Sequence, residues 1–260
     1  MGWVMGIWRM LFIIAMVVSA QNTYAIVSME TVHLGKPPEG YSGAFNVDAS
    51  GAFGNTQTGL VAAGLKLVRQ KNPATDFMLV NYQYGESRGV RDKNKAFIHG
   101  RHIQQISDKY AWEGFAQLSK DEFTRLTLRG LLGAGVRIGL WQSSKLTQGY
   151  LGLGGFYERE KLDVDTSTGE DDREIAWRGN MYFVIKSKLN EAVSLLSTTY
   201  YQPNLERIAD YRAIENASLV SKLTEKLAAK ISLDVSHDSK PPSGVKQTDT
   251  TITVGIDVSF

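Results

Sequence analysis

The sequence predicts an all-β protein, a closed antiparallel transmembrane β-barrel of about twelve strands. The first observation is the C-terminal segment 251–260, which alternates apolar and polar side chains and ends on Phe260. Successive side chains of a strand point to opposite faces, so this segment has one apolar and one polar face. The second observation is that the same pattern recurs along the chain. The third is an N-terminal segment that is typical of exported proteins.

Residues 1–25 are expected to be a secretory signal peptide. One charged residue, Arg9, precedes an apolar run at 10–20, and Thr23-Tyr24-Ala25 resembles a cleavage site. The run is shorter than the roughly 20 residues that a membrane helix needs. Cleavage after Ala20 and an uncleaved anchor are the alternatives. Residues 26–39 then form a periplasmic N-terminal lead, and residues 40–260 form the barrel.

Composition excludes several classes of protein. Removing Arg9 lowers the formal net charge from +2 to +1, so no nucleic-acid partner is expected. The chain has no cysteine, which excludes disulfides, cysteine-based metal sites, a thiol nucleophile and a lipoprotein anchor. Export through an oxidising compartment agrees with this composition.

The two-faced segments divide residues 40–260 into strands. Segments of this kind need about 9–11 residues to cross a membrane at a tilt. The predicted strands lie near 40–53, 56–70, 75–85, 94–106, 109–119, 124–141, 146–160, 174–188, 192–202, 212–223, 226–237 and 248–260. Their even number places both chain ends on the periplasmic side.

The connections alternate in length, as that topology requires. Short connections are expected at 71–74, 107–108, 142–145, 190–191 and 224–225, and longer ones at 85–93, 161–173, 202–211 and 238–247. Two outward connections, after Gly54 and after Lys120, are also short. All six prolines fall in predicted turns or before the first strand, where their missing backbone N–H removes no hydrogen bond between strands. Residues 204–230 also have helix-like spacing, and a helix there would leave ten strands.

Several motifs resemble a family of outer-membrane β-barrels of unknown function, typified by the salt-induced outer membrane protein of enteric bacteria. The motifs are Gly54-Asn55-Thr56-Gln57-Thr58, Gly133-Ala134-Gly135-Val136-Arg137, Gly154-Gly155-Phe156-Tyr157-Glu158-Arg159-Glu160, His237-Asp238-Ser239-Lys240-Pro241-Pro242 with Thr248-Asp249-Thr250-Thr251, and the terminal Phe260. The resemblance covers nearly the whole mature chain. It implies a bacterial outer-membrane location and no catalytic residues. The favoured hypothesis for the barrel is a structural or stress-related role in the envelope. The resemblance also implies that Phe260 is the signal read by the barrel-assembly machinery.

Charged residues on the polar strand faces are the candidates for function. Charge on the lipid side is costly, so these side chains are expected to face the lumen. The candidates are Glu113, Arg125, Arg129, Arg137, Arg178, Lys186, Lys230 and Asp234. If acids and bases pair across the interior, the lumen is narrow or plugged. If bases dominate an open bore, the barrel is a porin-like pore that favours small anions.

Enzyme and metal chemistry have weaker support. His99 and His102 are three residues apart, so in a strand they face opposite sides and form no metal site together. A membrane-embedded lipid hydrolase would join His, Ser, Asn and Gly in one strand segment, and no segment here does. The acidic loop 163–172 carries oxygen ligands for calcium without the spacing of a dedicated loop. No catalytic residue, metal or cofactor is therefore predicted.

The expected partners are lipid and the assembly machinery. Aromatic residues cluster toward the predicted strand ends, where the interfacial girdles of a barrel form. An aromatic-rich soluble core is the alternative explanation. In the membrane the contacts are outer-membrane lipid and lipopolysaccharide, with the C-terminal strand presented to the assembly machinery.

Overall fold

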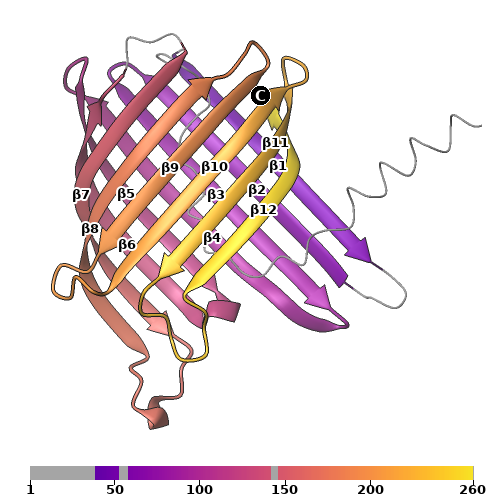
Figure 1. Cartoon of the computed structure of the whole chain (residues 1–260), viewed down its shortest axis with the longest axis vertical. Helices are drawn as coiled ribbons and strands as arrows, with labels where there is room; N and C mark the ends of the chain where they lie inside the picture. Colours follow the sequence, from indigo (N-terminus) through magenta and orange to yellow (C-terminus); the bar gives the residue numbers. More distant parts are fainter. Residues whose placement is uncertain (1–38, 53–57, 142–145, 260) are drawn as a thin grey trace, which may run out of the picture.

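The computed structural model describes residues 39–52, 58–141 and 146–259. In this part of the chain, twelve antiparallel strands form one closed barrel, which confirms the predicted fold class (Figure 1). The strands are β1 (Gly40–Ala52), β2 (Thr58–Lys71), β3 (Ala74–Ser87), β4 (Val90–Gln105), β5 (Tyr110–Asp121), β6 (Leu126–Gly139), β7 (Thr147–Leu162), β8 (Arg173–Lys188), β9 (Val193–Pro203), β10 (Tyr211–Lys222), β11 (Leu227–Asp238) and β12 (Thr248–Ser259). The expected signal peptide and Phe260 lie outside the described residues.

Each strand pairs with its neighbours in sequence, and β1 meets β12 through Ala44↔Ser259 and Phe45↔Val258. One end of the barrel carries the connections 163–172, 204–210 and 239–247, and we call it the long-loop end. The opposite end, the short-turn end, carries the connections after β2, β4, β6, β8 and β10. The described chain has no helix long and apolar enough to cross a membrane, and its helical residues form two 3-10 turns, η1 (Glu122–Thr124) and η2 (Thr166–Thr168).

Two details of the expected segmentation are wrong, and the helix alternative is excluded. The helix alternative for 204–230 fails because β10 and β11 occupy most of that segment, in register with each other. The connection expected at 85–93 is a two-residue hairpin turn, Arg88-Gly89, between longer strands. Both turn residues have positive φ, 52° and 73°, which is the geometry of a tight turn that matches strand twist. Pro203 is the last residue of β9 rather than part of the connection.

Alternation along the strands separates two faces of the wall. In β8 the even positions from Ala176 to Lys186 are all buried, while the odd positions from Ile175 to Ile185 are partly or fully exposed. Because the outside of an isolated barrel is open, a buried strand side chain faces the interior. The outward side is apolar across most strands, with exposed residues that include Val61, Met78, Ile98, Leu118, Leu132, Leu153, Trp177, Met181, Leu219, Ile231, Leu233, Ile252, Val254 and Ile256.

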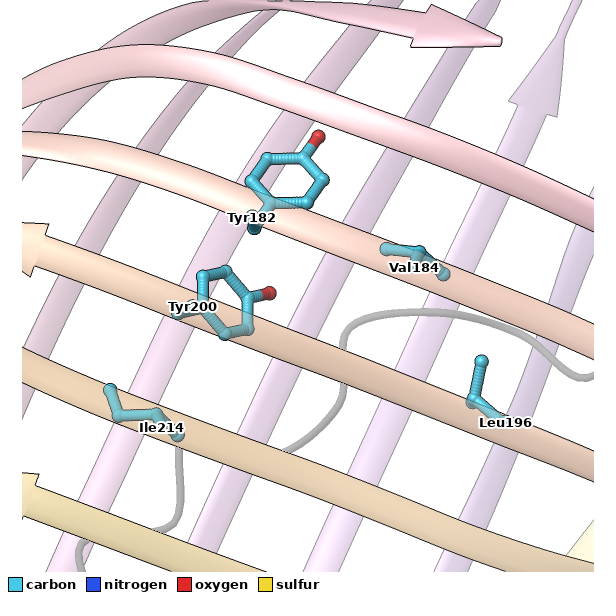
Figure 2. Close-up of a cluster of buried hydrophobic side chains, with 5 residues drawn as sticks. All are labelled: Tyr182, Val184, Leu196, Tyr200 and Ile214. Atoms are coloured by element: carbon cyan, nitrogen blue, oxygen red, sulfur yellow. The ribbon is translucent and has the colours of Figure 1, made fainter. Parts of the chain in front are cut away.

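An apolar cluster fills part of the lumen. Figure 2 shows its members on the inner face of β8, β9 and β10. They are Tyr182, Val184, Leu196, Tyr200 and Ile214, none more than 5% exposed. Apolar side chains therefore interrupt the polar inner face that the alternation predicts. Close packing on this wall removes apolar surface from water and narrows the lumen.

Glycine in β7 makes room for this cluster. A Cβ on Gly152 would lie 2.0 Å from the ring of Tyr182, which is too close for two carbon atoms that are not bonded to each other. We expect Gly152→Ala to destabilise the barrel by about 1–3 kcal/mol, because the ring must move or the strand must shift. Denaturant midpoints of the protein refolded into lipid vesicles measure this. Gly100→Ala is the matched control, since its Cβ would meet nothing closer than 4.0 Å. Equal midpoints for the two variants would contradict the packing.

Candidate functional site in the lumen

The structure places most of the predicted lumen residues on the inner face. Glu113, Arg137, Arg178 and Lys186 are buried, and the Arg129 side chain is 12% exposed. Lys230 and Asp234 have inward parity on β11 and are partly exposed. Arg125 differs from the others. It was expected within the sixth strand, but it ends the turn η1 with a φ of 58° and is exposed, and β6 begins one residue later.

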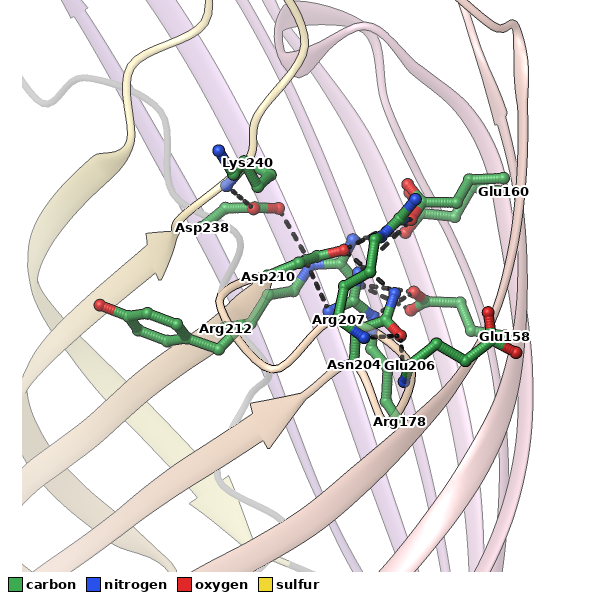
Figure 3. Close-up of polar contacts among 12 residues, drawn as sticks. Glu158, Glu160, Arg178, Asn204, Glu206, Arg207, Asp210, Arg212, Asp238 and Lys240 are labelled. Atoms are coloured by element: carbon green, nitrogen blue, oxygen red, sulfur yellow. Dashed lines mark hydrogen bonds and ion pairs between the residues drawn. The ribbon is translucent and has the colours of Figure 1, made fainter.

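A cluster of charged side chains occupies the lumen toward the long-loop end (Figure 3). Three guanidinium groups and four carboxylates form it, and we call them the ion network: Arg129, Arg178, Arg212, Glu158, Glu160, Asp210 and Asp238. They come from β6, β7, β8, β10 and β11 and from the connection 204–210. The members that strands supply lie in the halves of their strands nearer the long-loop end.

Glu158 on β7 is the shared acceptor of the ion network. Its side chain is 1% exposed. Arg178 Nε donates to Oε1 at 2.9 Å, Arg212 Nη1 donates to both oxygens at 2.8 and 2.7 Å, and Arg129 Nε lies 3.4 Å from Oε2. A carboxylate this deeply buried is tolerable only with such partners, since removing a lone charge from water is very costly.

Arg212 connects distant parts of the wall. Its Nη2 donates to Glu160 at 2.8 Å, and its Nε donates to Asp238 at 3.0 Å. Because β8 and β9 lie between β10 and β7 in the sheet, the contacts of Arg212 with Glu158 and Glu160 cross part of the lumen. Arg129 on β6 donates to Glu160 from the other side. The ion network therefore links β6, β7, β8, β10 and β11 on the inside of the barrel.

The connection 204–210 is attached to the ion network. Arg178 Nη1 donates to Asp210 at 3.0 Å, and Asn204 Nδ2 donates to the same carboxylate at 3.1 Å. Burial of Asp210 opposes ionisation, but the charge and hydrogen bonds of Arg178, with the hydrogen bond of Asn204, outweigh it and hold the pKa of Asp210 below its ordinary value. The connection is thus held against the lumen by an ionised carboxylate.

This attachment should weaken in acid. The pKa of Asp210 is lower in the folded protein than the unfolded value of about 3.9, so its carboxylate stabilises the attached connection at any pH above that unfolded pKa. This contribution is lost as the pH falls through the pKa of the folded protein. We expect the connection 204–210 to become more accessible to an acid-stable protease below about pH 4. Asp210→Asn should show high accessibility at pH 7 and a smaller further change in acid. An identical pH response of the two proteins would contradict the role of Asp210.

A second contact crosses the lumen at mid-height. Tyr182 on β8 donates its hydroxyl to Glu113 on β5 at 2.8 Å, over the intervening strands β6 and β7. Arg101 on β4 pairs with the same carboxylate at 3.3 Å. Its guanidinium lies 5.3 Å from the ring centroid of Phe115 and 5.5 Å from that of Tyr182. Cation–π contacts of this kind hold a buried arginine in place.

Toward the short-turn end the lumen carries cations on an aromatic ring. The guanidinium of Arg137 lies 3.9 Å from the ring centroid of Tyr150, and Lys186 Nζ lies 5.5 Å from it. Both cations are buried on the inner face. They come from β6 and β8, on either side of the strand that carries the tyrosine. This region presents two cations, whereas the ion network mixes three guanidinium groups with four carboxylates.

The wall beside the apolar cluster, formed by β11 and β12, is less filled. Asp234 accepts a hydrogen bond from Asn216 Nδ2 at 2.7 Å. Lys95 on β4 is within electrostatic range of Asp121, Asp234 and Asp249, which come from β5, β11 and β12. The inward positions of β11 and β12 are largely half-exposed or exposed. Solvent therefore reaches the lumen along this side.

Sequence reasoning missed central members of the ion network. Glu158 and Glu160 stood within a quoted motif but were not proposed as lumen residues, although they alternate with the exposed Tyr157, Arg159 and Lys161. That alternation was the available signal. Arg212 and Asp210 lie at a strand start and in a connection, where alternation assigns no face.

The histidines and the acidic loop have ordinary structural contacts. His99 lies between the rings of Phe97 and Phe115 inside the barrel, and His102 pairs with Asp76 at 2.7 Å on the outward face. In the loop 163–172, Asp165 accepts hydrogen bonds from Ser167 that lower the pKa of its carboxyl. Residues 39–52, 58–141 and 146–259 contain no group of three or more His, Cys, Asp or Glu side chains that could hold a metal ion.

Residues 48–260 match the family described as "Protein of unknown function, DUF481". The chain therefore belongs to this family, whose description assigns no activity. Among curated protein sequences, none matches the chain.

Solved structures with a similar course of the chain include two porins and the translocator domain of an autotransporter. The NanC porin has a TM-score of 0.49 and 10% identity over 84% of this chain and 98% of its own. The KdgM porin has a TM-score of 0.45 and 10% identity, over 85% and 99%. The translocator domain of the autotransporter NalP from Neisseria meningitidis has a TM-score of 0.45 and 9% identity, over 85% and 87%. At this level of similarity, the solutes of those proteins are not assigned to this chain.

Proposed function

We propose that this member of the DUF481 family is a non-enzymatic β-barrel of the bacterial outer membrane, with a lumen that the ion network narrows. The observation that carries the proposal is the contrast between the two faces of one wall. In β8, Trp177, Met181 and Ile185 point outward, and Arg178 and Lys186 point inward and are buried. The described strands have 11 to 16 residues, enough for a tilted crossing of about 9–11.

Exposed aromatic residues support a position in a bilayer. Tyr110, Trp112 and Trp141 lie near the short-turn end, and Tyr157, Trp177 and Tyr201 lie nearer the long-loop end. Aromatic side chains at both levels are typical of membrane interfaces. In the proposed orientation the short-turn end faces the periplasm and the long-loop end faces outward. The signal peptide, cleaved on export, is part of the same proposal.

The long-loop end supports a restricted entrance. A polar cavity of about 180 Å³ lies above the ion network, between the connections 163–172 and 239–247. Glu170 accepts a hydrogen bond from the backbone of Ser243 at 2.9 Å, which ties one connection to the other. A solute entering from outside would meet these tied connections first and then the ion network.

The lack of catalysis is proposed from the surroundings of the histidines. His99 is enclosed by aromatic rings and Gln117, and His102 contacts Asp76 and Trp112. None of these partners is a nucleophile that a histidine could activate. Incubation with labelled phospholipid should release no fatty acid. Release that disappears in His102→Ala would establish the lipid-hydrolase alternative instead.

Planar-bilayer conductance tests the narrow lumen. We expect single-channel steps of the wild type to be far below those of a sixteen-stranded general porin in the same salt. The double variant Glu158→Gln with Arg212→Gln should conduct more, because the contacts across the lumen are lost. Wild-type steps as large as those of the general porin would contradict the proposal.

A small-solute pore is the second candidate. The half-exposed inward residues of β11 and β12 favour it, because they leave one side of the lumen accessible to solvent. Its signature is a steady small conductance in the wild type with a measurable ion preference. A structural or stress-related role of a closed barrel instead predicts no steps in the wild type, with envelope defects in a deletion strain at high salt.

The C-terminal residue gives a further prediction. Phe260 lies outside the described residues, directly after β12. We expect deletion of Phe260 to lower the amount of protein in the outer-membrane fraction, because the assembly machinery would lose its recognition signal. The control is Phe260→Tyr, which keeps a terminal aromatic ring. Normal outer-membrane levels after the deletion would contradict the prediction.

A further inference from the structure

The outward face of β4 to β7 carries an apolar groove of about 470 Å³. It exists because small residues interrupt the apolar wall: Gly100, Ala116 and Gly130 lie among larger side chains. Ile98, Leu118, Leu132 and Tyr157 form its sides. In the register of the sheet, Ile98 pairs with Leu118, and Leu118 pairs with Gly130, so the groove runs across neighbouring strands rather than through the wall.

Three exposed cations border this groove on the side of the long-loop end. Arg159 lies directly across from Gly130, and Lys161 lies across from Leu128, one outward position nearer the rim. Lys120 lies two residues beyond Leu118 along β5. From strand geometry, Arg159 and Lys161 are about 7 Å apart along β7, and Lys120 and Lys161 are about 10 Å apart across β6.

The strands that carry this surface present charge of one sign outward. The outward positions of β5, β6 and β7 contain no acidic residue, since Glu113, Asp121, Glu158 and Glu160 of these strands are buried and face inward. Within the described chain, Lys120, Arg159 and Lys161 form no ion pair at salt-bridge distance, and Lys120 lies within electrostatic range of the exposed Glu122 in the turn that follows β5. A ligand that matches the surface therefore has apolar chains for the groove and more than one anionic group for the cations.

We propose that this surface binds lipid A, the phosphorylated and multiply acylated anchor of lipopolysaccharide. One acyl chain occupies the groove, and the phosphates contact Lys120, Arg159 and Lys161 as charge-assisted pairs. The inference rests on the proposed function, which puts the long-loop end in the outer leaflet. Lipid A is the occupant rather than a glycerophospholipid because the cations are spread over about 10 Å, which suits two phosphates better than one.

Native mass spectrometry of the purified mature barrel in detergent tests the site. The probe is hexa-acylated diphosphoryl lipid A, compared with monophosphoryl lipid A and with phosphatidylglycerol. We expect one lipid A to be retained, with affinity falling at least tenfold for phosphatidylglycerol and several-fold for the monophosphoryl form. Heat-modifiable migration in gels verifies that each protein is a folded barrel.

Variants separate the two parts of the site. The triple charge reversal Lys120→Glu, Arg159→Glu and Lys161→Glu should lower lipid A affinity at least tenfold. Ala116→Leu should lower it several-fold by filling the groove. The matched controls are Lys226→Glu, an exposed lysine at the short-turn end, and Ala134→Leu, an outward alanine of β6 outside the groove. Both controls should bind as the wild type does.

Two results would overturn the inference: phosphatidylglycerol binding as tightly as lipid A, or controls that lose binding as much as the groove and charge variants. Failure of the proposed function has a different signature, which is absence of the folded barrel from the outer-membrane fraction. A barrel that is folded in the outer membrane but shows no preference for lipid A refutes this site alone.

Discussion

Arg178→Met is expected to destabilise the folded barrel by about 3–5 kcal/mol, because it removes one partner from a buried set of charges. The side chain is 1% exposed and contacts Glu158 and Asp210. Without it, four carboxylates of the ion network remain with two guanidinium groups. Methionine keeps much of the volume, so the loss reports charge rather than packing. Denaturant unfolding in lipid vesicles gives the free energy.

Arg207→Met is the matched control for this prediction. Arg207 also pairs with Asp210, at 3.3 Å, and with Glu174, but its side chain is 65% exposed. Exposed ion pairs contribute about 0–1 kcal/mol, so this variant should unfold close to the wild type. If both variants cost the same, the ion network does not act as a buried brace.

Tyr182→Ala is expected to lower the free energy of unfolding by about 3–5 kcal/mol, since it leaves a cavity in the apolar cluster. It also removes the hydroxyl that donates a hydrogen bond to the Glu113 carboxylate. The ring is 2% exposed and contacts Tyr200 with centroids 5.4 Å apart. It also fills the space above Gly152. In bilayers the same variant should raise conductance, because the contact between β8 and β5 across the lumen is lost.

Tyr182→Phe and Tyr201→Ala separate the causes. The phenylalanine variant keeps the ring and loses the hydrogen bond to Glu113, so we expect a cost of about 1.5–3 kcal/mol. Tyr201 is outward and 37% exposed, and its removal should change conductance little. If Tyr182→Ala leaves both stability and conductance unchanged, the lumen is not packed at mid-height.

Alternation predicted the barrel well because it is a local property of strands. Register and strand length then follow from which residues must avoid hydrocarbon. The helix-like spacing of 204–230 did not prevail, because β10 supplies Arg212 and Asn216 to the lumen and pairs with β9 and β11 over most of its length. The misplaced connection 85–93 shows the limit of composition, since its polar residues are strand residues beyond a tight turn.

The site was harder to predict than the wall. Alternation indicates that Arg178 faces inward, but it does not say which carboxylates lie opposite. Glu158 meets Arg212 across two intervening strands, and that distance depends on barrel curvature and shear. The bulge between Leu126 and Leu128 shifts the alternation by one residue, so that Leu126 is buried while Arg125 is exposed before the strand. Single-sequence patterns do not place bulges.

The absence of cysteine allows the most direct test of the central claim, that hydrocarbon covers one face of each strand. Single cysteines at 175, 177, 181, 183 and 185 and at 176, 178, 180, 184 and 186 of β8 would carry a nitroxide spin label in lipid vesicles. We predict that the odd positions collide preferentially with oxygen, which concentrates in hydrocarbon, and that the even positions do not. Loss of this alternation, or folding of the purified chain in buffer without any lipid or detergent, would contradict the account.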